Sequence, residues 1–214
     1  MTATLVNSDP QSVEHRLLQL GLETGPLLEA IYQAHLHRIR LTPNHPKIFP
    51  GLEMWGWAVA ALRQQLRPFG WLGVDENNFP LTVQEERCLA ISVASGDEAT
   101  GNAFAHPSNR SRKGRSTVEA VEANQQGDMF EELLPQTHDE AGGRETWVLL
   151  HHTDVIRKEI RIELSKPSDI GKDGKISAWS ERLILGSISF DDDLTEILPP
   201  SGPEIDIEIR RKAS

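Results

Sequence analysis

The chain has 214 residues, of which 38% are hydrophobic and 25% charged, a composition typical of one globular domain that carries a solvated insertion. Its 32 acidic residues outnumber its 22 lysines and arginines, so the formal net charge of −10 should repel nucleic acid and anionic membranes, and any DNA contact must be local. The one cysteine, Cys88, excludes an intramolecular disulfide and a multi-cysteine zinc site.

The N-terminus indicates neither export nor membrane insertion. It lacks the basic start and apolar run of a secretory signal, and no stretch approaches the ~18 apolar residues of a membrane span. Low cysteine content fits a reducing compartment. We therefore expect a cytoplasmic protein in which Cys88 is a small buried residue of a strand.

Residues 1–70 predict three helices that pack on a sheet. Apolar residues recur at helical spacing in three stretches, which begin after an expected N-cap at Ser12, near Thr24 and near Leu52. The apolar stripe of the third helix is Leu52, Trp55, Val59, Leu62 and Leu66. We expect this stripe to contact the chain's own sheet, while Trp57 lies off it and is suited to a surface contact. The alternative is that the stripe and the tryptophans form an interface with a partner.

From Trp71 onward the apolar period changes from 3.6 to 2, which predicts strands. Residues 71–96 read as a first hairpin, and residues 146–210 contain further alternating runs, including EIRIEL at 159–164 and EIDIEI at 204–209. In EIRIEL we expect the isoleucines to face inward and Glu163 to face outward. Because helices come first and hairpin-like strands follow, the predicted class is α+β, with a mainly antiparallel sheet.

Residues 97–145 lack sustained apolar alternation and are rich in Gly, Ser, Asn, Gln and charged residues, so we expect a long flexible insertion with a short helix at STVEAVEAN. The insertion contains the basic tract NRSRKGR. Its cations are suited to a weak contact with DNA phosphates that depends on salt and not on base sequence. These candidate residues are Arg110, Arg112, Lys113 and Arg115. The alternative is a solvated segment.

Further along the insertion, the five residues QGDMF resemble the short peptide with which bacterial polymerases, repair proteins and mobile-element proteins bind the replicative sliding clamp. That pattern is Gln, usually Leu, Asp or Ser, an aliphatic residue and Phe. Gln126, Asp128, Met129 and Phe130 fit it, whereas Gly127 replaces the preferred Leu and should weaken binding. The resemblance implies that Met129 and Phe130 enter an apolar pocket of the clamp. The alternative is that they form a helical turn packed on the chain's own sheet.

Motifs for catalysis or metal binding are not evident. A phosphate-binding loop, HExxH, GxSxG and paired CxxC are all missing from the sequence. His35 and His37 would point about 200° apart on a helix, and consecutive His151 and His152 would face opposite sides of a strand. The run Asp191–Asp193 is typical of a solvated turn. We therefore assign no catalytic residue, no cofactor and no metal.

The leading hypothesis is a non-enzymatic accessory or adaptor protein of bacterial DNA metabolism or of a mobile element. It would reach the sliding clamp through residues 126–130 and bind a further protein through its folded body. One alternative is a hydrolase or nuclease with an unrecognised acidic site, which converging carboxylates would favour. Another is a non-catalytic subunit of a larger assembly, which an exposed aromatic patch around Trp57 would favour.

Overall fold

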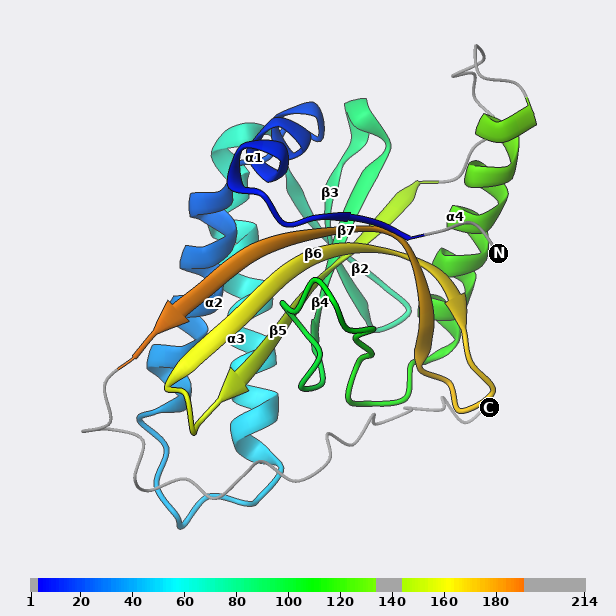
Figure 1. Ribbon diagram of the computed structural model, residues 1–214. Helices are drawn as coiled ribbons and strands as arrows, with labels where there is room; N and C mark the ends of the chain where they lie inside the picture. Colours follow the sequence, from blue (N-terminus) through cyan, green and yellow to red (C-terminus); the bar gives the residue numbers. More distant parts are fainter. Residues whose placement is uncertain (1–3, 134–143, 191–214) are drawn as a thin grey trace, which may run out of the picture.

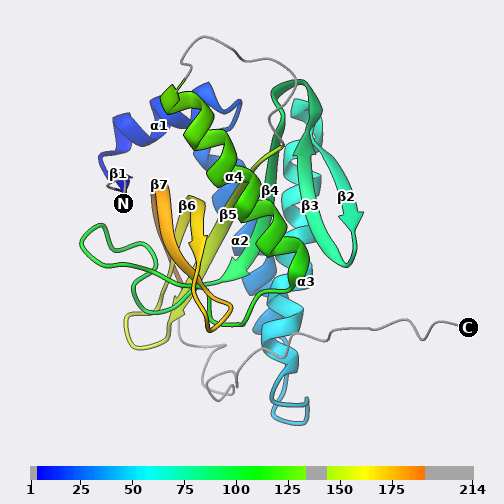
Figure 2. The same cartoon turned by 90° about the vertical axis from the view of Figure 1, so that its right-hand side faces the viewer.

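A seven-stranded sheet carries helices on both faces in the computed structural model, which describes residues 4–133 and 144–190 (Figure 1). Four α-helices lie within these residues, and the predicted α+β class is confirmed. Three helices lie on one face and the fourth on the other (Figure 2). Their bounds are α1 Pro10–Gln19, α2 Thr24–Arg38, α3 Phe49–Leu66 and α4 Arg115–Leu133. Across the described ranges, none of these helices has both the length and the apolar character needed to cross a bilayer.

Two three-stranded meanders lie side by side in the sheet, and β1 adds a seventh strand at one edge. The strands are β1 Leu5–Asn7, β2 Leu72–Glu76, β3 Phe79–Gln84, β4 Leu89–Ser95, β5 Glu145–Asp154, β6 Glu159–Ile170 and β7 Ile176–Ser189. Their order is β1-β7-β6-β5-β4-β3-β2. In the described sheet, β1–β7 and β4–β5 are parallel and the other four pairings are antiparallel. A parallel neighbour needs a long crossover connection, and the segment containing α4 makes the one from β4 to β5.

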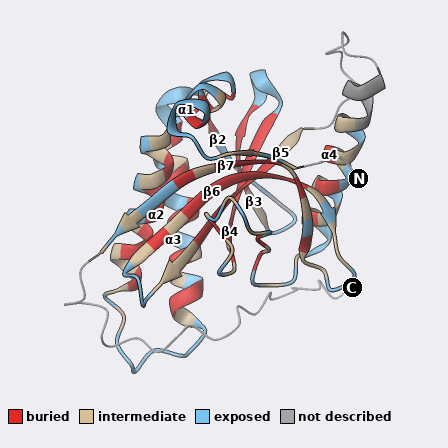
Figure 3. Ribbon diagram, viewed as in Figure 1, coloured by how far each residue is buried: buried red, intermediate tan, exposed pale blue. Residues whose placement is uncertain are grey.

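The main core lies between the sheet and the first three helices. Along α3, Met54, Ala58 and Leu62 are buried, whereas Leu52 is 47% exposed and Trp55 is only partly buried. The buried face is therefore rotated slightly from the predicted stripe. Alternate residues of the central strands face this core, and buried positions run along their length in Figure 3.

The start of the chain differs from prediction in two ways. Asp9, not Ser12, caps α1, because its Oδ2 accepts hydrogen bonds from both the Ser12 backbone N and Oγ at 3.0 Å. The strand β1, which the sequence did not predict, pairs in parallel with Glu181–Leu183 of β7. Three residues are too few to show the alternation by which strands are predicted.

The first hairpin is present as predicted, but its cysteine is not buried. β3 and β4 pair antiparallel, and Leu89, Ile91 and Val93 face the main core. Cys88 instead ends the short 3₁₀ turn Glu85–Arg87, is exposed, and has a φ of 51°. Its expected burial was wrong because the strand begins one residue later, after a turn that needs a left-handed residue.

The expected flexible insertion is largely structured where it is described. α4 has 19 residues and is longer than the predicted short helix, since helix-forming Ala, Glu and Gln extend the run. The preceding loop is bonded to the sheet: the backbone N of Arg110 donates to Ser95 O at 2.9 Å and that of Lys113 to Gly174 O at 2.7 Å. Residues 134–143 and the strand expected at 204–210 lie outside the described residues.

Candidate protein-binding site on the fourth helix

One side of α4 packs against the sheet, and the predicted clamp motif begins on its other side. Thr117, Val121 and Asn124 are buried and Asp128 is half-buried. These positions are three or four residues apart and so lie on one helical face. Gln126 lies opposite that face and is exposed. The side chains of Met129 and Phe130 lie outside what the structure describes.

Asn124 joins the middle of α4 to two strands. Its Nδ2 donates to Thr146 O at 2.8 Å and to Pro167 O at 3.0 Å, while its Oδ1 accepts from the Thr146 backbone N at 2.9 Å. The Asn124 side chain is buried, so these bonds replace contacts with water. The helix is thereby fixed to β5 and β6 at this point.

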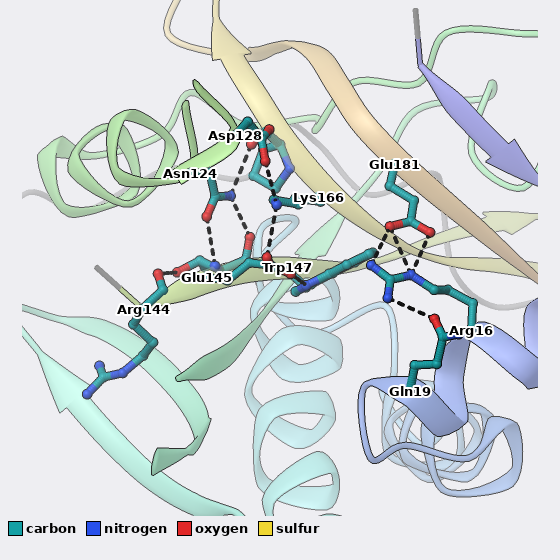
Figure 4. Close-up of polar contacts among 11 residues, drawn as sticks. Arg16, Gln19, Asn124, Asp128, Arg144, Glu145, Trp147, Lys166 and Glu181 are labelled. Atoms are coloured by element: carbon teal, nitrogen blue, oxygen red, sulfur yellow. Dashed lines mark hydrogen bonds and ion pairs between the residues drawn. The ribbon is translucent and has the colours of Figure 1, made fainter. Parts of the chain in front are cut away.

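One turn further along, an ionic contact holds α4 to the sheet (Figure 4). Lys166 Nζ donates to Asp128 Oδ1 at 2.6 Å and to Glu145 Oε2 at 2.9 Å. Burial lowers the pKa of Lys166, but the charges and hydrogen bonds of Glu145 and Asp128 more than offset this and raise it above its ordinary value. Lys166 is therefore a cation at neutral pH, and the motif residue Asp128 is one of its two anchors.

The polar contacts continue from Glu145 to α1, as Figure 4 shows. Trp147 Nε1 donates to Glu145 Oε1 at 2.6 Å, and the Arg16 guanidinium lies 5.9 Å from the centroid of the Trp147 ring. Arg16 also pairs with Glu181 of β7 at 2.9 Å. A groove of about 560 Å³ adjoins Arg16 and Glu181 between α1 and β1. These polar contacts thus form a chain that connects α4 with β5, β6, β7 and α1.

The basic tract does not join the clamp motif. Arg110 and Arg112 are exposed, Lys113 is half-buried, and Arg115 pairs with Glu119 one turn along α4 at 2.8 Å. Arg115 begins α4, whereas Gln126 lies eleven residues further along, a rise of roughly 17 Å. The two candidate sites are therefore separate surfaces.

The histidines do not converge. His35 is buried with its ring 4.6 Å from that of Phe190, whereas His37 stacks on Trp57 at 3.4 Å. His151 is buried, and His152 lies on the opposite face of β5 with Nδ1 3.3 Å from Gly96 O. Within residues 4–133 and 144–190, no three side chains of His, Cys, Asp or Glu gather where a metal could bind. Asp191–Asp193 lie outside these ranges.

A buried ion pair between Glu163 and Arg182 was not predicted from the sequence. Glu163 was expected to face outward, but it is fully buried because the loop at residues 96–109 covers that face of β6. Arg182 of β7 donates to Glu163 Oε2 at 2.6 Å and Oε1 at 3.1 Å, and also to Ala105 O at 2.7 Å. Glu163 in turn accepts from Gly101 N at 2.8 Å. The pair therefore fixes the loop to the sheet, a tertiary contact that alternation alone does not reveal.

Comparisons with known proteins supply no relative whose function could be carried over. No family model matches the chain, and neither a curated protein nor a solved structure matches it. The residues and contacts described above are therefore the basis for the function proposed below.

Proposed function

We propose that the protein is a non-enzymatic accessory protein of bacterial DNA metabolism or of a mobile element, which binds the replicative sliding clamp through residues 126–130. The observation that carries the proposal is the placement of this motif. Gln126, the residue that would set the register on the clamp, is exposed on the side of α4 that faces away from the sheet. A clamp surface can approach it there without displacing the core.

Full engagement requires the end of α4 to leave the sheet. The clamp peptide would use Asp128 as a hydrogen-bond acceptor, but Asp128 binds Lys166 in the docked helix. Asn124 fixes the helix upstream, so the segment that opens begins after it. Gly127 lowers helix stability by about 1 kcal/mol relative to alanine, which favours opening at this point. We therefore expect weak, micromolar binding that becomes useful through avidity on a ring-shaped clamp.

A second protein partner is supported by the outer surface of α2 and α3. Trp57 is 40% exposed, stacks on His37 at 3.4 Å, and donates from Nε1 to Glu53 at 2.9 Å. Tyr32 and Leu52 are also exposed on these helices. A rigid aromatic residue with its polar group already satisfied is typical of interface anchors. We propose this surface as the contact of the folded body with its partner.

The acidic residues of the sheet favour a structural role over a hydrolytic one. Glu163 pairs with Arg182 at 2.6 Å, and Glu145 and Glu181 pair with Lys166 and Arg16 at 2.9 Å. A carboxylate neutralised by a neighbouring cation is poorly placed to activate water or bind a metal. We therefore prefer the adaptor to the hydrolase or nuclease.

The test is binding of the purified full chain to a bacterial sliding clamp, measured by titration calorimetry. We expect micromolar binding that Phe130→Ala and Gln126→Ala abolish. Glu122→Ala, an exposed change elsewhere on α4, is the matched control and should bind like the wild type.

A further variant tests the opening step. Lys166→Met removes the contact that holds Asp128, worth about 1 kcal/mol for a partly exposed pair, so clamp affinity should rise about fivefold. If neither the wild type nor Lys166→Met binds the clamp at high micromolar concentration, the proposal is wrong.

A further inference from the structure

Phe104 is fully exposed on a loop that is bound to the sheet. The residue is 100% exposed, so its ring contributes nothing to the core. Its backbone N nevertheless donates to Asn102 Oδ1 at 3.0 Å, and Arg182 of β7 donates to the carbonyl oxygens of Asn102 and Ala105 at 3.2 and 2.7 Å. The aromatic ring is therefore presented to solvent by a backbone that is fixed on both sides of it.

The same loop continues along β7 toward the start of that strand. Ser108 Oγ donates to Ile176 O at 2.8 Å, and Asn109 Oδ1 accepts from Ile176 N at 2.7 Å. Between Arg182 and Ile176, the two points of attachment on β7, the strand spans roughly 20 Å at about 3.3 Å per residue. The loop thus forms a fixed surface of about this length beside β7.

Beyond Asn109, the basic tract meets the turn between β6 and β7. The Lys113 backbone N donates to Gly174 O at 2.7 Å, and a Cβ added to Gly174 would lie 2.5 Å from Arg112 Cγ, so the stem of Arg112 packs on this turn. The turn itself contributes Lys172, which is exposed, and Lys175, which is half-buried. Within the described residues, Arg112, Lys172 and Lys175 form no ion pair. The fold therefore adds two lysines to the basic tract that the sequence showed.

An exposed aromatic ring and a group of cations on one fixed surface suit a single strand of nucleic acid. Unpaired bases can stack on the face of Phe104, while lysine and arginine contact the phosphates. A duplex keeps its bases stacked on one another and offers no face to the ring. A protein pocket or a lipid surface is less suited, because the exposed neighbours of Phe104 are the polar Asn102 and His106 and not an apolar patch.

We propose that the surface formed by Phe104, Arg112, Lys172 and Lys175 binds single-stranded DNA. One base stacks on Phe104, and phosphates a few nucleotides away contact the cations at the β6–β7 turn. Two aspartates of that turn and the net charge of −10 limit the affinity, so we expect micromolar binding at low ionic strength that weakens as salt rises. The choice of DNA over RNA rests on the proposed role in DNA metabolism, whereas the surface is separate from the clamp motif.

The experiment is a fluorescence-anisotropy titration of a labelled oligothymidylate of about twelve nucleotides with the full chain, in the absence of clamp. Phe104→Ala should weaken binding about tenfold without changing the dependence on salt, because stacking releases no counterions. Lys172→Gln should weaken binding about threefold at low salt and reduce the slope of log affinity against log salt by about 0.7. A duplex of the same length should bind at least about tenfold more weakly than the single strand.

Two matched controls test whether these effects belong to the proposed surface. Ile156→Ala removes another exposed hydrophobic residue, 93% exposed on the turn between β5 and β6, and should bind like the wild type. Lys47→Gln removes an exposed lysine between α2 and α3 and should do the same. Phe104→Ala should also unfold at the same Tm as the wild type, because the ring makes no core contact, so its weaker binding reports the lost stacking.

The inference is overturned if the single strand does not bind at high micromolar protein and low salt, or if either Phe104→Ala or Lys172→Gln binds it like the wild type. It is also overturned if an RNA strand of the same length binds at least about tenfold more tightly than DNA. Failure of the clamp proposal gives a different result: Gln126→Ala should bind the oligonucleotide like the wild type. DNA binding without clamp binding would therefore overturn the clamp role alone, and the opposite pattern would overturn this inference alone.

Discussion

Replacing Glu163 by leucine should destabilise the protein by about 3–5 kcal/mol, because it leaves a buried guanidinium without its carboxylate. Glu163 and Arg182 are 0% and 2% exposed, so water cannot solvate the remaining charge without local opening. Arg182→Met should have a similar effect, since Glu163 would keep its bonds from Gly101 N and Ser165 Oγ but lose its cation.

The double variant Glu163→Leu/Arg182→Met separates charge from packing. It buries no charge, but four polar groups lose a partner. Asn102 O and Ala105 O lose the bonds from Arg182 at 3.2 and 2.7 Å, and Gly101 N and Ser165 Oγ lose their acceptor Glu163 at 2.8 Å. The three backbone groups belong to a partly exposed loop where water can replace the lost bonds, so the main cost, about 1–3 kcal/mol, comes from the buried Ser165 hydroxyl. The double variant should therefore lose less than the roughly 6–10 kcal/mol obtained by adding the two single changes.

Urea unfolding monitored by tryptophan fluorescence measures these differences, because Trp147 and Trp179 are buried in the sheet. Glu159→Gln on the same strand is a control: its carboxylate is 3.7 Å from Arg161 and partly exposed, so its loss should cost under about 1 kcal/mol. Single changes at Glu163 and Arg182 that cost less than about 1 kcal/mol, or that add within about 0.5 kcal/mol, would refute this reasoning.

Three other outcomes can be measured on the same material. Burial lowers the pKa of His151 from its ordinary value of 6.5 to about 3 in the folded protein, so the unfolded chain takes up the proton first as pH falls, and stability should decline below pH 6.5 until about pH 3. At pH 5 this amounts to about 2 kcal/mol, so His151→Gln should lose about that much less than the wild type between pH 7 and 5, and equal losses would contradict the assignment. Asn124→Ala should destabilise by about 2–3 kcal/mol and speed hydrogen exchange in residues 115–133, whereas unchanged exchange there would mean that other contacts hold α4. Cys88 should react fully with a thiol reagent in the native protein, and a thiol protected until unfolding would contradict its exposed position.

The periodicity of apolar residues predicted several helices and strands, because these elements depend on residues close together in sequence. The alternation of Leu89, Ile91 and Val93 located β4 and its inward face, and the spacing of apolar residues located α2 and α3. The alternation in EIRIEL predicted that Glu163 faces solvent. Alternation shows which residues share one face of a strand, but it does not show whether a loop covers that face. Cys88 was predicted to be buried in β4, but the strand begins one residue later, at Leu89.

For the candidate sites, too, the sequence predicted individual residues but not their tertiary contacts. Gln126 and Asp128 could be selected from a five-residue pattern, but their setting could not, since Lys166 lies 38 positions away from Asp128 in sequence. At the end of α2 the sequence showed only a cation in the last helical turn, whereas the fold buries the Arg38 side chain there.

The parallel pairing of β1 with β7 also determines when the N-terminal strand can join the sheet during translation. Thr4 Oγ1 donates to Trp179 O across 175 positions of sequence, so β1 cannot dock until β7, the last strand among the described residues, has left the ribosome. At about 5–20 residues per second, the N-terminal segment waits on the order of ten seconds or more. The edge of β7 is exposed for as long as β1 is undocked, which makes an extended N-terminal segment a useful point at which to follow the completion of folding during translation.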